Sequence, residues 1–183
     1  MQLRPEDEAS DNEFEAFLSA GNLGPRQVSR IRMEKEGLPE VRLSDYSAII
    51  VGGGPSNVSD RRKPRTQTKF EVPLLKLMGE ILQRDFPFFG ACYGLGILAY
   101  YRGGRVSDEK YSETVGATTI ELTKEAREDP LLKDLPHKFR AFGGHKEACQ
   151  NIPPGSVLLA TSKLCPIQMI RTKKNIYATQ FHP

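Results

Sequence analysis

The sequence contains Phe88-Phe89-Gly90-Ala91-Cys92-Tyr93-Gly94, an apolar run that leads into the pattern G-x-C-x-G. Small residues on both sides of a nucleophile allow a sharp strand-to-helix turn, from which the middle side chain projects. The partial positive charge of a helix N-terminus favours the thiolate form of a cysteine at that place. The stretch therefore predicts a nucleophilic Cys92 on a tight turn, with a thiol pKa below the free value of about 8.5.

The chain ends on Tyr177-Ala178-Thr179-Gln180-Phe181-His182-Pro183, a second apolar strand followed directly by a histidine. A free cysteine is most often a small buried hydrophobic residue, and a histidine at a strand end is often satisfied by the backbone. Together the two segments favour another interpretation, in which His182 is the base that takes the proton of Cys92. The pair predicts a hydrolase-like thiol enzyme.

The composition indicates one soluble globular domain, residues 1–183. The net charge of +3 is small and spread along the chain, which favours neither nucleic acid nor an acidic membrane surface as a partner. No apolar stretch approaches the roughly 20 residues of a membrane-spanning helix. The acidic N-terminal residues and three widely spaced cysteines predict a cytoplasmic protein without disulfides, and the spacing of cysteines and histidines gives no metal site.

Strand-like and helix-like segments alternate in the first half of the chain, and strands follow one another in the second half. This order predicts an α/β fold with three layers, α/β/α, around a mainly parallel central sheet. The predicted helices are residues 12–20, 70–84 and a segment that begins near Gly94. The predicted strands are residues 42–51, 87–89, 116–122, 138–142, 157–160, 167–171 and 176–181.

Five short motifs occur in the order found in class I glutamine amidotransferases. They are Gly52-Gly53-Gly54-Pro55, Gly90-Ala91-Cys92-Tyr93-Gly94, Gly103-Gly104-Arg105-Val106, Gly144-His145-Lys146-Glu147 and Gln180-Phe181-His182-Pro183. From about residue 46 to 183 the chain resembles the glutaminase domain of the GMP-synthase type. The resemblance implies a flavodoxin-like fold and hydrolysis of the side-chain amide of glutamine, with the ammonia passed to a separate synthase. It implies no cofactor.

The resemblance and the motif positions assign roles around Cys92 and His182. The glycine loop follows a buried strand, so we expect the N–H of Gly53 or Gly54, together with that of Tyr93, to form the oxyanion hole. The loop that contains Gly144, His145 and Glu147 matches the family segment S-H-x-D. The resemblance implies that this loop meets the α-amino and carboxylate groups of glutamine, with Glu147 as partner of the ammonium.

The sequence departs from the family pattern at three places. Gly96 stands where the family has a glutamine that contacts the substrate, and Pro183 precedes the position of the glutamate that orients the histidine. The segment that begins at Met1 lacks the usual apolar first strand, so we expect a domain trimmed at both ends. Two alternatives stay open: a hydrolase of γ-glutamyl amides or peptides on the same fold, and a regulatory subunit without catalysis.

Overall fold

The computed structural model describes residues 1–183 and is α/β, as predicted. Its α-helices are α1 (Asp7–Ala20), α2 (Met33–Glu36), α3 (Arg65–Arg84) and α4 (Tyr93–Tyr101), and its 3-10 helices are η1 (Pro25–Gln27), η2 (Leu43–Asp45) and η3 (Glu125–Glu128). Its strands are β1 (Ile49–Val51), β2 (Phe88–Ala91), β3 (Val106–Ser107), β4 (Glu113–Leu122), β5 (Lys138–His145), β6 (Ala148–Cys149), β7 (Ser156–Thr161), β8 (Met169–Thr172) and β9 (Ile176–Thr179). No helix combines the length and the apolar composition that crossing a bilayer demands.

Seven strands form the central sheet in the order β1-β2-β9-β8-β7-β4-β5, and β3 and β6 form a separate small ribbon. Only the pairs β1–β2 and β2–β9 are parallel, whereas the other four pairs are antiparallel. The expectation of a mainly parallel sheet is therefore wrong beyond β9. The reason is the length of the connections: β8 and β9 are joined by a tight turn with Lys173 at φ 56°, which is too short for a helical crossover.

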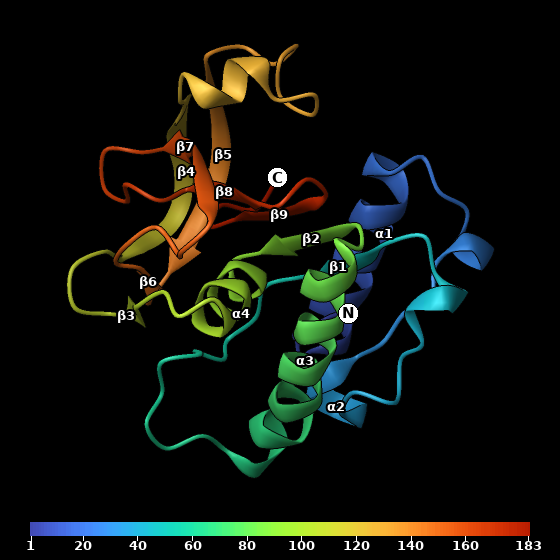
Figure 1. Cartoon of the computed structure of the whole chain (residues 1–183). Helices are drawn as coiled ribbons and strands as arrows, with labels where there is room; N and C mark the ends of the chain where they lie inside the picture. Colours follow the sequence, from blue (N-terminus) through green and yellow to red (C-terminus); the bar gives the residue numbers. More distant parts are fainter.

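The sheet separates two groups of buried apolar side chains. Helices α3 and α4 pack against one face, where the larger core includes Phe70, Leu98 and Ile176. Over β4, β7 and β9 the opposite face is covered by η3 and the turns after it, which contribute Ala126 and Leu132. Figure 1 shows the parallel strands beside α3 and α4, and the antiparallel strands turning away toward η3.

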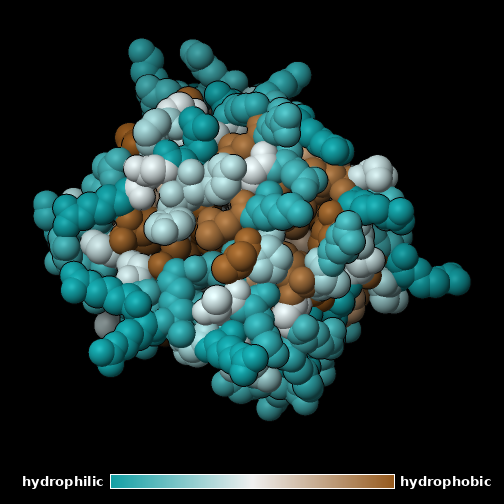
Figure 2. Space-filling view, turned by 60° about the horizontal axis from the view of Figure 1, so that its bottom comes forward, coloured by the Kyte–Doolittle hydropathy of each residue, from teal (hydrophilic) through white to brown (hydrophobic).

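The exterior matches a chain of which 27% of residues are charged. Figure 2 shows hydrophilic side chains over most of one face, with apolar side chains gathered in a band across its middle. More than half of the surface of a folded protein is contributed by apolar atoms, because polar side chains do not suffice to cover a globular protein. A cavity lies beside α4, at the carboxyl ends of the parallel strands.

Candidate active site

Cys92 lies on the sharp turn between β2 and α4. Its backbone has φ 52° and ψ −96°, a left-handed conformation that is rare for residues other than glycine. The turn closes tightly, because a Cβ on Gly90 would lie 2.7 Å from the carbonyl carbon and oxygen of Gly94. The N–H of Cys92 donates to the carbonyl of Thr179 at 2.7 Å and so ties the turn to the end of β9. The predicted strand-turn-helix geometry is confirmed.

His182 follows β9, the strand that pairs with β2 in the register Ala91↔Thr179. Cys92 and His182 therefore leave the sheet from neighbouring strands. A Cβ built on Gly53 would lie 3.1 Å from Cβ of Cys92 and 3.2 Å from Nε2 of His182. The structure thus brings these three residues together, although Cys92 and His182 are 90 positions apart in the sequence.

The backbone N–H groups of Gly53, Gly54 and Tyr93 belong to the segments that contain or adjoin this point. The N–H of Tyr93 is bonded to the sulfur of Cys92 and lowers the pKa of the thiol, although stronger influences oppose it. The N–H groups of Gly53 and Gly54 have no acceptor within the protein. Leu3 fixes the glycine loop from behind, since a Cβ on Gly54 would lie 2.5 Å from its Cβ. The N–H groups of Gly53 and Gly54 are therefore free to donate to a bound molecule.

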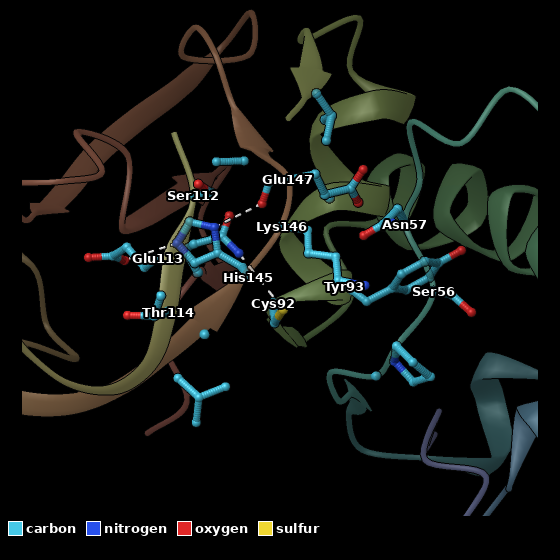
Figure 3. A pocket seen from close by; sticks show the side chains of 18 residues that line it. Ser56, Asn57, Cys92, Tyr93, Ser112, Glu113, Thr114, His145, Lys146 and Glu147 are labelled. Carbon is cyan, nitrogen blue, oxygen red and sulfur yellow. Dashed lines mark hydrogen bonds and ion pairs between the residues drawn. The ribbon is translucent and has the colours of Figure 1, made fainter. Parts of the chain in front are cut away.

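A cavity of about 500 Å³ opens in front of Cys92. Gly144, His145 and Glu147 line it at the end of β5 and in the turn that follows, where Gly144 has φ 155°. In Figure 3 the ring of His145 lies between Glu113 and the turn, on the side of the cavity opposite Tyr93. The remaining lining residues are Pro55, Ser56, Asn57, Gly96, Val106, Ser112, Thr114, Val115, Lys146, Ala148, Gln180 and Gly54.

Both carboxylate oxygens of Glu147 accept hydrogen bonds from the loop that follows the glycines. The N–H of Val58 donates to Oε1 at 2.6 Å, and the N–H of Ser59 donates to Oε2 at 2.8 Å. Glu147 is buried and therefore joins the turn after β5 to this loop. Val58 and Glu147 also fill the space beside Gly96, where a Cβ would lie 3.1 Å from Cγ2 of Val58 and 3.4 Å from Oε1 of Glu147.

The protonation of the two central groups differs from the expected thiolate. Burial, and after it the negative charge of Glu147, raises the pKa of the Cys92 thiol to about 11. The prediction of a lowered thiol pKa is therefore wrong, because desolvation outweighs the helix N-terminus and the N–H of Tyr93. Burial, together with the positive charges of Arg4 and His145, lowers the pKa of His182. At neutral pH the site holds a neutral thiol beside a neutral imidazole.

The sequence patterns assign no role to several residues that lie in or next to the site. Gln180 Nε2 lies 3.8 Å from Sγ of Cys92, and Glu113 accepts a bond from His145 at 2.9 Å. Glu71 accepts a bond from the hydroxyl of Tyr93 at 2.7 Å. Only Gln180 could have been found from the sequence, since it belongs to the closing motif. Nothing in the spacing of Glu71 or Glu113 distinguishes them from surface carboxylates.

Comparison with known proteins agrees with this geometry. The family model described as glutamine amidotransferase class-I matches residues 19–183. The chain is 34% identical over 145 residues to a glutamine-hydrolysing GMP synthase of Thermosipho melanesiensis and 33% identical over 145 residues to that of Limosilactobacillus reuteri. Each match covers 79% of this chain and 25% of the relative, so the chain spans about a quarter of the length of the curated relatives it matches.

Solved structures show the same fold. A glutamine amidotransferase from Thermotoga maritima superimposes with a TM-score of 0.74 at 22% identity, over 92% of this chain and 68% of the other. A glutamine amidotransferase from Methylobacillus flagellatus gives 0.72 at 25% identity, over 92% of this chain and 63% of the other. Because the family model covers most of the sequence, this protein belongs to the class I glutamine amidotransferases.

Proposed function

We propose that this protein is a Cys-His glutaminase, which hydrolyses the side-chain amide of glutamine through a thioester on Cys92. The observation that carries the proposal is that Cys92 and His182 both approach Gly53. A Cβ built on this glycine would lie 3.1 Å from Cβ of Cys92 and 3.2 Å from Nε2 of His182. A nucleophile and a base that both approach one point, beside unbonded backbone N–H groups, match the requirements of acyl transfer.

The reaction starts from a neutral pair. Nε2 of His182 takes the thiol proton of Cys92 as the sulfur attacks the amide carbon, and the carbonyl oxygen becomes an oxyanion. The imidazolium then gives its proton to the departing nitrogen, so that ammonia leaves and a thioester remains. Water attacks the thioester, His182 takes a proton from that water and returns it to the sulfur, and glutamate leaves. The raised pKa of Cys92 favours proton transfer concerted with attack over a stable thiolate.

The oxyanion is assigned to the N–H of Tyr93 together with that of Gly53 or Gly54. Donors placed at the developing charge reduce the barrier because they need no reorganisation during the reaction, and the loss of one typically costs about 10²–10³ in rate. The buried bond from Tyr93 to Glu71 at 2.7 Å supports this role, since it fixes the first residue of α4.

The α-amino and α-carboxylate groups of glutamine are assigned to the turn with Gly144, His145 and Glu147. The carboxylate of Glu147 already accepts two backbone bonds, which leaves it lone pairs for an ammonium group. Lys146 lines the same cavity and supplies a cation for the substrate carboxylate.

The ammonia acceptor is proposed to be a separate synthase. The names of the relatives describe glutamine hydrolysis joined to GMP synthesis, whereas this chain matches a quarter of their length. We assign to this chain the glutamine half of such a reaction.

A second candidate substrate is a γ-glutamyl amide or peptide. A cavity of about 500 Å³ lies within the range of about 300–1,000 Å³ that holds drug-sized ligands, which leaves room for a conjugate larger than glutamine. The attack on the γ-carbonyl would be the same, with an amine in place of ammonia as the leaving group.

Release of glutamate and ammonia from glutamine, measured in parallel with γ-glutamyl conjugates, tests both candidates. Cys92→Ser should abolish release, and Cys165→Ser should preserve it, because a serine there can still donate to the carbonyl of Ile167. A glutamine analogue with an electrophilic carbon should label Cys92 alone. Absence of labelling and of release from every substrate would favour the non-catalytic regulatory subunit.

A further inference from the structure

The ring of His145 is enclosed between two hydrogen-bond acceptors. Its Nδ1 lies 3.0 Å from the carbonyl oxygen of Glu147, and its Nε2 lies 2.9 Å from Oε2 of Glu113. The side chains of His145 and Glu113 are exposed to only 1% and 4%. A backbone carbonyl accepts and never donates, and a carboxylate does the same when it is ionised. The ring therefore donates from both nitrogens, as an imidazolium with Glu113 as its counter-ion.

The surroundings of Glu113 agree with an ionised carboxylate. Nε2 of Gln168 donates to Oε2 at 2.7 Å, beside the bond from His145. The hydroxyl of Thr118 donates to Oε1 at 3.2 Å. The hydroxyl of Ser162 lies 3.2 Å from Oε1 and 3.2 Å from the carbonyl oxygen of Cys165, and its one proton can be donated to either. These donors stabilise the ionised form of the carboxylate. A proton shared between a carboxylate and an imidazole resides on the imidazole, which is the stronger base of the two.

The turn after β5 is consequently held from two directions. On one side the imidazolium of His145 binds the carbonyl of Glu147. On the other side the carboxylate of Glu147 binds the N–H groups of Val58 and Ser59 at 2.6 and 2.8 Å. Both ring nitrogens of His145 are occupied by the protein, so its ring is not available to bind a substrate.

We propose that Glu113 is a positioning residue of the candidate site, which acts through the His145 imidazolium to hold the Gly144–Glu147 turn in its substrate-binding shape. That the turn binds glutamine rests on the proposed function. In this proposal His145 does not contact the substrate but holds the turn in position. The charge of His145 also reaches the base, because it contributes to the lowered pKa of His182.

Replacement of Glu113 by glutamine removes the counter-charge but keeps the size of the side chain. A buried imidazolium without a counter-ion is strongly unfavourable, so the ring gives up one proton. The bond from Nδ1 to the carbonyl of Glu147 then comes from a neutral donor and is weaker than the charge-assisted bond. The turn is held less firmly. The matched control is Glu121→Gln on the same strand β4, because Glu121 pairs with Lys138 on the surface at 2.7 Å.

The first measurement is ¹⁵N–¹H correlation spectroscopy of the histidine rings at pH 7 in the free protein, with His145→Asn for assignment. We expect protons on both ring nitrogens of His145 in the wild type and in Glu121→Gln, and on one in Glu113→Gln. Amide exchange of residues 144–148 should accelerate only in Glu113→Gln. A neutral His145 ring in the wild type, or unchanged exchange in Glu113→Gln, overturns the proposal.

The second measurement is the steady-state hydrolysis of glutamine. A displaced binding turn weakens substrate positioning, so we expect Glu113→Gln to raise KM about 10- to 100-fold while kcat changes less than about threefold. Glu113→Asp, which keeps the charge, should restore part of the loss. If Glu113→Gln does not fold, Thr118→Val and Glu113→Asp give a graded series on the same carboxylate. Equal KM values for the Glu113 and Glu121 variants, or a loss confined to kcat, overturn the proposal.

Failure of the proposed function has a different signature. If the wild type releases glutamate from neither glutamine nor γ-glutamyl conjugates, the glutaminase assignment falls. The histidine spectra and the amide exchange still decide whether Glu113 holds the turn, since both are measured without substrate.

Discussion

The ring of His182 lies against Gly53 so closely that a methyl group on this glycine would come within 2.5 Å of Cε1. The same methyl group would lie 3.1 Å from Cβ of Cys92. The glycine loop after β1 is therefore the surface on which both central side chains rest. Its lack of side-chain volume is a requirement of the site.

Gly53→Ala should displace His182 from Cys92 and reduce kcat/KM for glutamine by about 10²-fold, a typical result of misplacement by an ångström. Gly116→Ala is the control, because a Cβ there meets nothing within 4 Å. Thermal unfolding should show both variants folded. Wild-type activity in Gly53→Ala would contradict the close approach.

Alkylation of Cys92 by iodoacetamide should increase with pH up to an inflection near 11, where the pKa of the buried thiol lies. Glu147→Gln removes a negative charge that raises this pKa, so more thiolate forms and alkylation at pH 8 should be faster. Arg4→Gln removes a positive charge that lowers it, and alkylation should be slower. Glu121→Gln should change nothing. An inflection at or below 8.5 in the wild type would contradict the raised pKa.

The acid limb of kcat/KM should lie below the ordinary histidine pKa of about 6.5. His182 acts as a base only when it is neutral, and its lowered pKa keeps it neutral to a lower pH. Arg4→Gln removes one of the charges that lower this pKa, so the limb should move to higher pH. Arg62→Gln is the control, because Arg62 is exposed. A limb that moves equally in both variants would exclude a local effect of Arg4.

Tyr93→Phe should destabilise the fold. Burial and the Glu71 carboxylate raise the pKa of Tyr93, so its hydroxyl remains a donor to Glu71 at 2.7 Å. Without that donor the buried carboxylate is less well satisfied, which costs about 1–3 kcal/mol of unfolding free energy. Tyr100→Phe on the same helix, where Tyr100 is half exposed, should cost almost nothing in urea unfolding. Equal midpoints would show that the Glu71 contact does not contribute.

The short motifs predicted more of the site than of the sheet. The G-x-C-x-G pattern implies its own turn, because a Cβ at position 90 would collide with the backbone of Gly94 and a Cβ at position 94 with the carbonyl oxygen of Val51. The place of Cys92 therefore follows from local sequence. Six of the seven predicted strands exist with ends shifted by at most three residues. The predicted strand 42–51 is wrong over most of its length, because only Ile49–Val51 forms β1 and Leu43–Asp45 forms η2. Strand direction, in contrast, depends on the length of the connections, and the turn Lys173-Lys174-Asn175 already indicated an antiparallel hairpin.

The electrostatics of the site could not be predicted in this way. The thiol pKa depends on how deeply Cys92 is buried and on a carboxylate 55 positions away, neither of which appears in the pattern around the cysteine. Glu113 illustrates the same limit. It stands at the start of an alternating strand, where a carboxylate usually faces water, and only the tertiary structure places the side chains of Thr118, His145, Ser162 and Gln168 around it.

The pairing of β2 with β9 has an evolutionary consequence. The register Ala91↔Thr179 fixes where Cys92 and His182 emerge, so the distance between them is set by one strand spacing and not by the chain that links them. That chain leaves after α4, builds the antiparallel half of the sheet and returns to the neighbouring position. Insertions or deletions in its outer turns can change the walls of the cavity without disturbing the pair. Proteins that evolve from this fold can therefore differ in the substrates that they bind while they keep the same pair of reacting side chains.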